Sequence, residues 1–76
     1  MKKIKLWSVV MFYPHDKAKL INTGERVLSK EPIKGIVTEI DKKQGLFEVA
    51  EVYPKGAMYG VWWVTKKEIT EVLYVV

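Results

Sequence analysis

Residues 34–52 constrain the fold most strongly, because they predict two β-strands joined by a tight polar turn. The turn, residues 41–45, is polar and ends in Gly45, a residue that tolerates the positive φ of short hairpin loops. Apolar and β-branched residues of the kind enriched in strands flank it on both sides. These are Ile36, Val37, Ile40, Phe47, Val49 and Val52.

The alternation in this hairpin is imperfect. Glu48 and Glu51 have opposite parity, so an unbroken strand would point them to opposite faces of the sheet. A β-bulge near Ala50 would place both carboxylates in solvent, and the same argument applies to the spacing of Val37 and Ile40. Strands that bend in this way are typical of a small, strongly curved sheet or barrel.

The other predicted elements follow from periodicity and turn residues. They are strands over residues 3–13, 25–30, 57–66 and 71–76, a loop over 14–24, a turn at 53–56 and one 3₁₀ turn over 66–70. Within the loop, residues 17–21 are long enough for one helical turn, which would not be stable alone.

The same periodicity predicts which side chains face the core. In the first strand these are Ile4, Leu6, Ser8, Val10 and Phe12. Its other face is also largely apolar after Trp7, so this half is either buried on both faces or forms an exposed apolar strip, and we favour a central or covered strand. Val27 is the predicted inward residue of the strand over 25–30. Val64 and Ile69 should point inward together, which places Trp62 inside and Trp63 outside.

Composition bounds the class of protein. The chain has 76 residues, so we expect a single domain over residues 1–76 that buries roughly 60% of its unfolded surface. With 49% apolar residues it has enough material for a core. It contains no cysteine and one histidine, which excludes disulfides, thiolate metal sites and multi-histidine sites within the chain.

These residues offer little for catalysis. His15 and Asp16 are neighbours in a loop, a placement that seldom gives the geometry of a general base with its orienting carboxylate, and no nucleophile is apparent. We therefore predict a non-enzymatic protein with no cofactor, no metal and no small-molecule substrate. Lys5 and Ser8 interrupt the apolar run near the start, which argues against a signal peptide, and no run approaches a membrane span. A cytoplasmic location without membrane contact is expected.

Three short patterns resemble those of small SH3-like barrels, as found in KOW, Tudor and phage-type domains. Residues 24–27 (GERV) resemble the family's opening strand, residues 34–40 (KGIVTEI) its hairpin strand, and residues 62–69 (WWVTKKEI) its closing element. The resemblance covers roughly residues 23–73. It implies an all-β, five-to-six-stranded SH3-like barrel, to which residues 3–13 would be added as an N-terminal strand that pairs with residues 73–76.

A surplus of apolar side chains favours a protein-interaction module, since exposed aromatic patches are common interface hot spots. The surplus consists of Trp7, Val9, Met11, Tyr13, Tyr59, Val61, Trp63 and the tail Tyr74, Val75 and Val76. The partner would be an unidentified protein or a second copy of the chain, and the small size suggests a phage or mobile-element origin.

The alternative is nucleic-acid binding, in which aromatic rings stack on bases and lysines neutralise phosphates. A net charge of +4 permits this ligand but does not require it, and we favour protein interaction slightly. The residues predicted to form the binding surface under either hypothesis are Lys5, Trp7, Tyr13, Tyr59, Trp63, Lys66 and Lys67.

Overall fold

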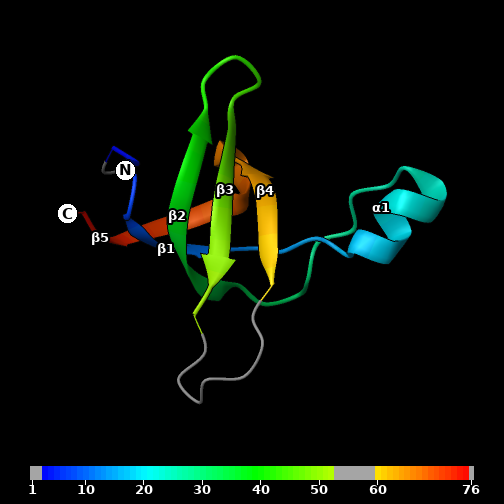
Figure 1. Ribbon diagram of the computed structural model, residues 1–76. Coiled ribbons are helices and arrows are strands. Elements are labelled where there is room, and N and C mark those ends of the chain that lie inside the picture. Colours follow the sequence, from blue (N-terminus) through cyan, green and yellow to red (C-terminus); the bar gives the residue numbers. More distant parts are fainter. Residues whose placement is uncertain (1–2, 53–59, 76) are drawn as a thin grey trace.

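The computed structural model describes residues 3–52 and 60–75 and consists mainly of strands (Figure 1). Its elements are β1 (Val9–Phe12), α1 (Lys17–Thr23), β2 (Ile33–Asp41), β3 (Leu46–Glu51), β4 (Val61–Thr65), the 3₁₀ helix η1 (Lys66–Glu68) and β5 (Ile69–Tyr74). The strands form one antiparallel sheet in the order β4-β3-β2-β1-β5. The predicted all-β class with one 3₁₀ turn is confirmed. The predicted turn at 53–56 and the start of the strand predicted over 57–66 lie outside the described residues.

The predicted hairpin is present as β2 and β3. Asp41 stabilises its turn, because the carboxylate accepts hydrogen bonds from the N–H groups of Lys43 and Gln44. Gly45 has φ 68°, the left-handed conformation that the turn requires.

The structure contains the bulge that the spacing of Val37 and Ile40 predicted, but the bulge predicted near Ala50 is wrong. The β2–β3 register shifts between Val37 and Glu39, whereas Ala50 pairs regularly with Ile36. The extra residue is therefore Thr38, and its hydroxyl donates to the carboxylate of Glu48. Inserting the bulge in β2 lets Val37 and Ile40 both pack on the core despite their odd spacing.

The first strand is shorter than predicted. The chain turns before Ser8, whose hydroxyl accepts a hydrogen bond from Lys5 N–H, and Trp7 adopts a positive φ of 69°. Ile4, Ser8, Val10 and Phe12 are buried as predicted, but Leu6 lies in this turn and is 47% exposed. β1 is flanked by β2 and β5, so it is a central strand, and Val9 pairs with Tyr74 of the C-terminal strand.

Residues 14–32 leave the sheet and return to it. Asp16 caps α1 by accepting from Lys19 N–H, and Gly24 ends the helix with φ 76°. The strand predicted over 25–30 is reduced to a single bridge between His15 and Leu28. Val27 is exposed and is not an inward anchor, because this segment forms its main-chain hydrogen bonds within the loop, such as Asp16 N–H to Val27 O.

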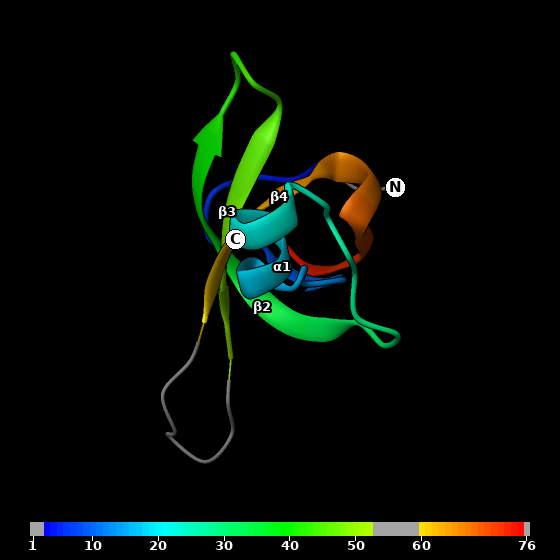
Figure 2. The same cartoon turned by 90° about the vertical axis from the view of Figure 1, so that its right-hand side faces the viewer.

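The core lies between two layers. Figure 1 shows β2, β3 and β4 side by side, with β1 and β5 crossing behind them, and Figure 2 shows the hairpin layer edge-on. The apolar side chains that are fully buried there are Val10, Phe12, Val37, Val49, Val64 and Ile69. Trp62 packs against this core with its ring 5.7 Å from that of Phe12, and Trp63 is 37% exposed, as predicted for the two tryptophans.

Gly35 makes the close packing of the layers possible, and Gly35→Ala tests this. A Cβ there would lie 2.4 Å from Val49 Cγ1 and 2.7 Å from Phe12 Cε1, too close for either side chain to stay in place. We expect a loss of about 1–3 kcal/mol in the free energy of unfolding, measured by urea denaturation. Gly45→Asn is the control, because that site has φ 68° and no neighbour within 4 Å. Equal stability of Gly35→Ala and the wild-type chain would contradict this account.

Candidate binding surface

One line of apolar residues crosses all five strands on the outer face of the sheet. Their partners across the strands are adjacent in the register: Tyr74 with Val9, Val9 with Ile36, Ile36 with Ala50, and Ala50 with Val61. Their chain neighbours Val10, Val37 and Val49 are fully buried, so the line itself faces outward. We call Val9, Ile36, Ala50, Val61 and Tyr74 the apolar row.

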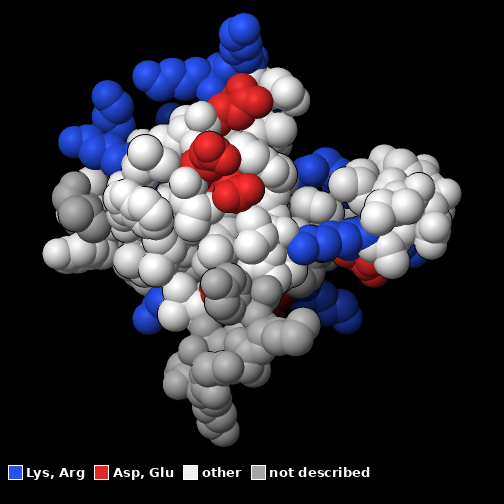
Figure 3. All heavy atoms as spheres, in the orientation of Figure 1, with Lys and Arg blue, Asp and Glu red and all other residues white. Residues whose placement is uncertain are grey.

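The apolar row is accessible on the surface. Tyr74 is 60% exposed and Val61 is exposed, while Val9, Ile36 and Ala50 are half-buried. Figure 3 shows the outer face of β2, β3 and β4 with uncharged surface in its middle, a small group of carboxylates above it and basic side chains at the margins. A band of this kind is suited to contact with another apolar surface.

Trp63 lies on the same outer face, beside the charged end of the hairpin. Its register partner is Glu48, which in turn pairs with Glu39. Trp63 also borders a shallow depression with Asp41 and Lys42. Its surroundings therefore combine an aromatic ring with carboxylates from two strands.

A groove of about 270 Å³ runs between β4 and α1. Its lining is mostly apolar, with three basic side chains and no carboxylate among the residues described: His15, Lys17, Leu20, Ile21, Arg26, Val61, Trp62 and Trp63. Because Val61 and Trp63 belong to both surfaces, the groove is continuous with the outer face. Ile21 is 82% exposed although it borders the groove.

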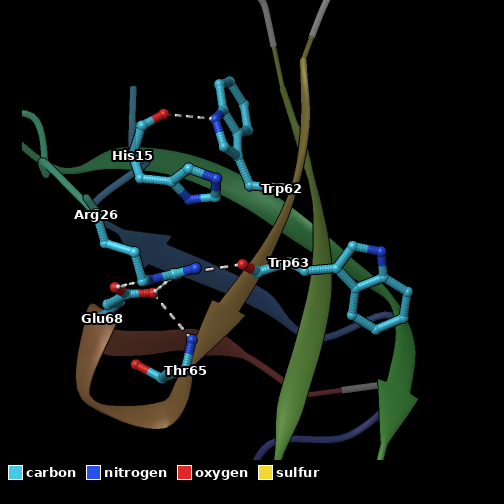
Figure 4. Close-up of polar contacts among 6 residues, drawn as sticks. All are labelled: His15, Arg26, Trp62, Trp63, Thr65 and Glu68. Atoms are coloured by element: carbon cyan, nitrogen blue, oxygen red, sulfur yellow. Dashed lines mark hydrogen bonds and ion pairs between the residues drawn. The ribbon is translucent and has the colours of Figure 1, made fainter. Parts of the chain in front are cut away.

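Side chains from distant parts of the chain hold the α1 loop against β4 (Figure 4). Arg26 forms a two-pronged ion pair with Glu68, with nitrogen–oxygen distances of 3.1 and 2.5 Å. Trp62 Nε1 donates to the carbonyl of His15 at 3.0 Å, and Lys17 Nζ lies 4.7 Å from the centre of the Trp62 ring. The groove is thus bordered by an anchored loop.

Two titratable groups belong to this anchor. Burial, followed by the charges of Arg26 and Lys17, lowers the pKa of His15 against the opposing effects of Glu68 and Asp16, and its Nδ1 is buried with no partner in the described residues. Burial alone would raise the pKa of Glu68, but hydrogen bonds from Arg26 and Thr65 N–H outweigh it and lower the pKa. Neutral His15 and ionised Glu68 are the forms that fit the fold.

The structure distributes the seven predicted surface residues over several places. Trp7 is 57% exposed and its N–H donates to Val37 O, so β2 and β3 lie between it and Trp63. Tyr13 is half-buried and contacts η1 through its N–H bond to Glu68 O. Lys5, Lys66 and Lys67 are exposed, and Tyr59 lies outside the described residues.

The apolar row could be found in part from the sequence. Val9, Val61 and Tyr74 were in the predicted apolar surplus, but Ile36 and Ala50 were not. Their signal is their parity, which is opposite to that of Val37 and Val49. The sequence alone does not predict that five such residues align across five strands, because that alignment depends on the register between the strands.

We expect the free energy of unfolding to fall as the pH drops below the ordinary 6.5 of histidine, chiefly through His15. The pKa of His15 is lowered in the folded protein from its ordinary 6.5, so the unfolded chain binds more protons as the pH falls below that value. Glu68 acts at lower pH, because its pKa lies below the ordinary 4.5. Urea denaturation at several pH values measures the slope. His15→Gln should flatten it, and an unchanged slope in this variant would refute the assignment.

Comparisons of the chain with protein-family models, with curated proteins and with solved structures find no match. In residues 3–52 and 60–75, no helix is long and apolar enough to cross a membrane. The same residues contain no group of three or more histidines and acids placed to hold a metal ion.

Proposed function

We propose that the protein is a non-enzymatic SH3-like binding module that binds another protein through the apolar row. The SH3-like part is supported by the strand order β4-β3-β2-β1-β5 and by the 3₁₀ helix between β4 and β5. Two of the three patterns that resemble SH3-like barrels lie in strands of this layout, with 34–40 in β2 and 62–69 in β4, η1 and the start of β5, whereas residues 24–27 form no strand.

The observation that carries protein binding is the continuity of the apolar row. Single exposed apolar residues are normal on a protein surface, but five in register across a whole sheet form a contiguous patch. Tyr74 and Trp63 add amphipathic aromatic rings, the side-chain type that is enriched at interface hot spots. A partner protein or a second copy of the chain would cover the same patch.

Nucleic-acid binding has weaker support. Its proposed stacking residues Trp7 and Trp63 are separated by two strands. Trp63 has Glu48 as its register partner and Glu39 one strand further, and these carboxylates would repel a phosphate backbone. Lys66 and Lys67 are exposed in η1, so charge reversal there should alter the salt dependence of binding only if nucleic acid is the ligand.

Photo-cross-linking tests the proposal. Replacing Ile36, in the middle of the row, by benzoylphenylalanine should give one discrete cross-linked product in cells, whereas the same residue in place of exposed Lys30 should not. Tyr74→Ser combined with Val61→Ser should remove most of the product, because both side chains are exposed parts of the row.

Two measurements complete this experiment. Sedimentation of the purified protein distinguishes a second copy from another protein, since only self-association depends on the concentration of this chain alone. Titration of its tryptophan fluorescence with oligonucleotides covers the alternative. Equal cross-linking from Ile36 and Lys30, or salt-sensitive oligonucleotide binding that survives Tyr74→Ser and Val61→Ser, would overturn the proposal.

A further inference from the structure

We propose that the outer edge of β4, which pairs with no other described strand, binds an extended segment of a partner protein as an added β-strand, in the groove between β4 and α1. This rests on the proposed function and names where and how the partner is held. The segment would alternate apolar and acidic side chains.

The main-chain groups of β4 point alternately toward β3 and away from it. Gly60 O accepts from Glu51 N–H, so residue 60 and, by strand alternation, Trp62 and Val64 bond to β3. The main-chain groups of Val61, Trp63 and Thr65 then point away from the sheet. Two contacts agree with this assignment: Trp63 O accepts from Arg26, and Thr65 N–H donates to Glu68.

These two contacts close only one end of the edge. The Arg26–Glu68 pair occupies Trp63 O and Thr65 N–H. Within residues 3–52 and 60–75, no hydrogen bond is formed by Trp63 N–H or by the outward N–H and C=O of Val61. This leaves the part of the edge next to the groove open for pairing, which is how extended peptides join exposed strands.

Helix α1 lies across the groove from the open part of this edge. None of its residues is buried, so it contributes little to the core, yet it is capped at both ends and anchored through Lys17 and His15. Leu20 and Ile21 line the groove opposite β4, and Ile21 is almost fully exposed. Figures 1 and 2 show that α1 lies outside the sheet, on the side of β4. A second wall beside an open strand edge gives an added strand side-chain contacts as well as main-chain bonds.

The surroundings of the β4 edge indicate which side chains the added segment would carry. Side chains of an added strand that align with Val61 and Trp63 would lie on the outer face, where apolar residues extend the apolar row by one strand. The alternate side chains would lie on the side of Trp62 and meet the groove. Lys17 is over the Trp62 ring there and has no carboxylate partner among the residues described, and no acid lines the groove. Charge complementarity therefore selects acidic residues at these positions.

The probe is a short acetylated peptide that alternates valine and glutamate, followed by tryptophan fluorescence and by amide exchange of the protein. We expect saturable binding and at least about tenfold slower exchange of Trp63 N–H. Peptides N-methylated on only the valines or only the glutamates separate strand pairing from side-chain contact, because alternate amides face β4. One set should weaken binding by about tenfold or more, and the other should not.

Lysine variants test the charge. Lys17→Gln should weaken binding of the glutamate peptide about twofold to fivefold and weaken a matched glutamine peptide less. Lys19→Gln is the control, because Lys19 is on the same helix but does not line the groove. No peptide binding, equal binding of both N-methylated peptides, or protection of Trp63 N–H that rises with protein concentration alone would overturn the inference. Cross-linking from Ile36 that persists in any of these cases would leave the proposed function standing.

Discussion

The inward packing of Val37 on β2 against Val49 on β3 is the constraint on which the rest of the structure depends. These two side chains are register partners and both are fully buried. Because side chains alternate along a strand, their position decides which residues of both strands face the core and which face outward. β1 and β4 then take their own orientation from pairing with β2 and β3.

The Thr38 bulge adjusts this constraint without breaking it. It allows Val37 and Ile40 to pack on the same core and bends β2, and β1 and β5 cross behind the hairpin layer (Figure 1). Gly35 removes the one Cβ that would collide with Val49 and Phe12 where the layers approach. The apolar row follows from the same alternation, because its residues alternate with core residues along the strands and therefore face outward.

The α1 loop is held by polar contacts and not by burial in the apolar core. Its helix has no fully buried residue, and its attachment relies on the Arg26–Glu68 pair, the Trp62–His15 hydrogen bond and Lys17 on the Trp62 ring. Of these contacts, the Arg26–Glu68 pair depends on the ionisation of Glu68, whereas the apolar core does not depend on pH in this way. The two proposed surfaces meet at β4, where Val61 and Trp63 face outward with their side chains and toward the groove with their main chain.

Local pattern in the sequence determined the hairpin, the 3₁₀ turn, the buried side of β1 and the opposite orientations of Trp62 and Trp63. Each of these follows from spacing within a few residues, which periodicity reports directly. Periodicity alone did not reveal that Leu6 lies in a turn, because the hydrogen bond from Lys5 N–H to the Ser8 hydroxyl forms that turn. It also did not reveal that residues 25–30 form almost no strand, because their main chain bonds to Pro14 O and Asp16 N–H.

The candidate surfaces needed the tertiary structure. Predicted surface residues were chosen by type, and the structure separates Trp7 from Trp63 by two strands. Ile36 and Ala50 enter the apolar row only through the register, and Glu68 meets Arg26 across 42 positions of sequence. Sequence pattern therefore determined which face of each strand is apolar, whereas the pairing of distant strands decided which of those faces form one surface.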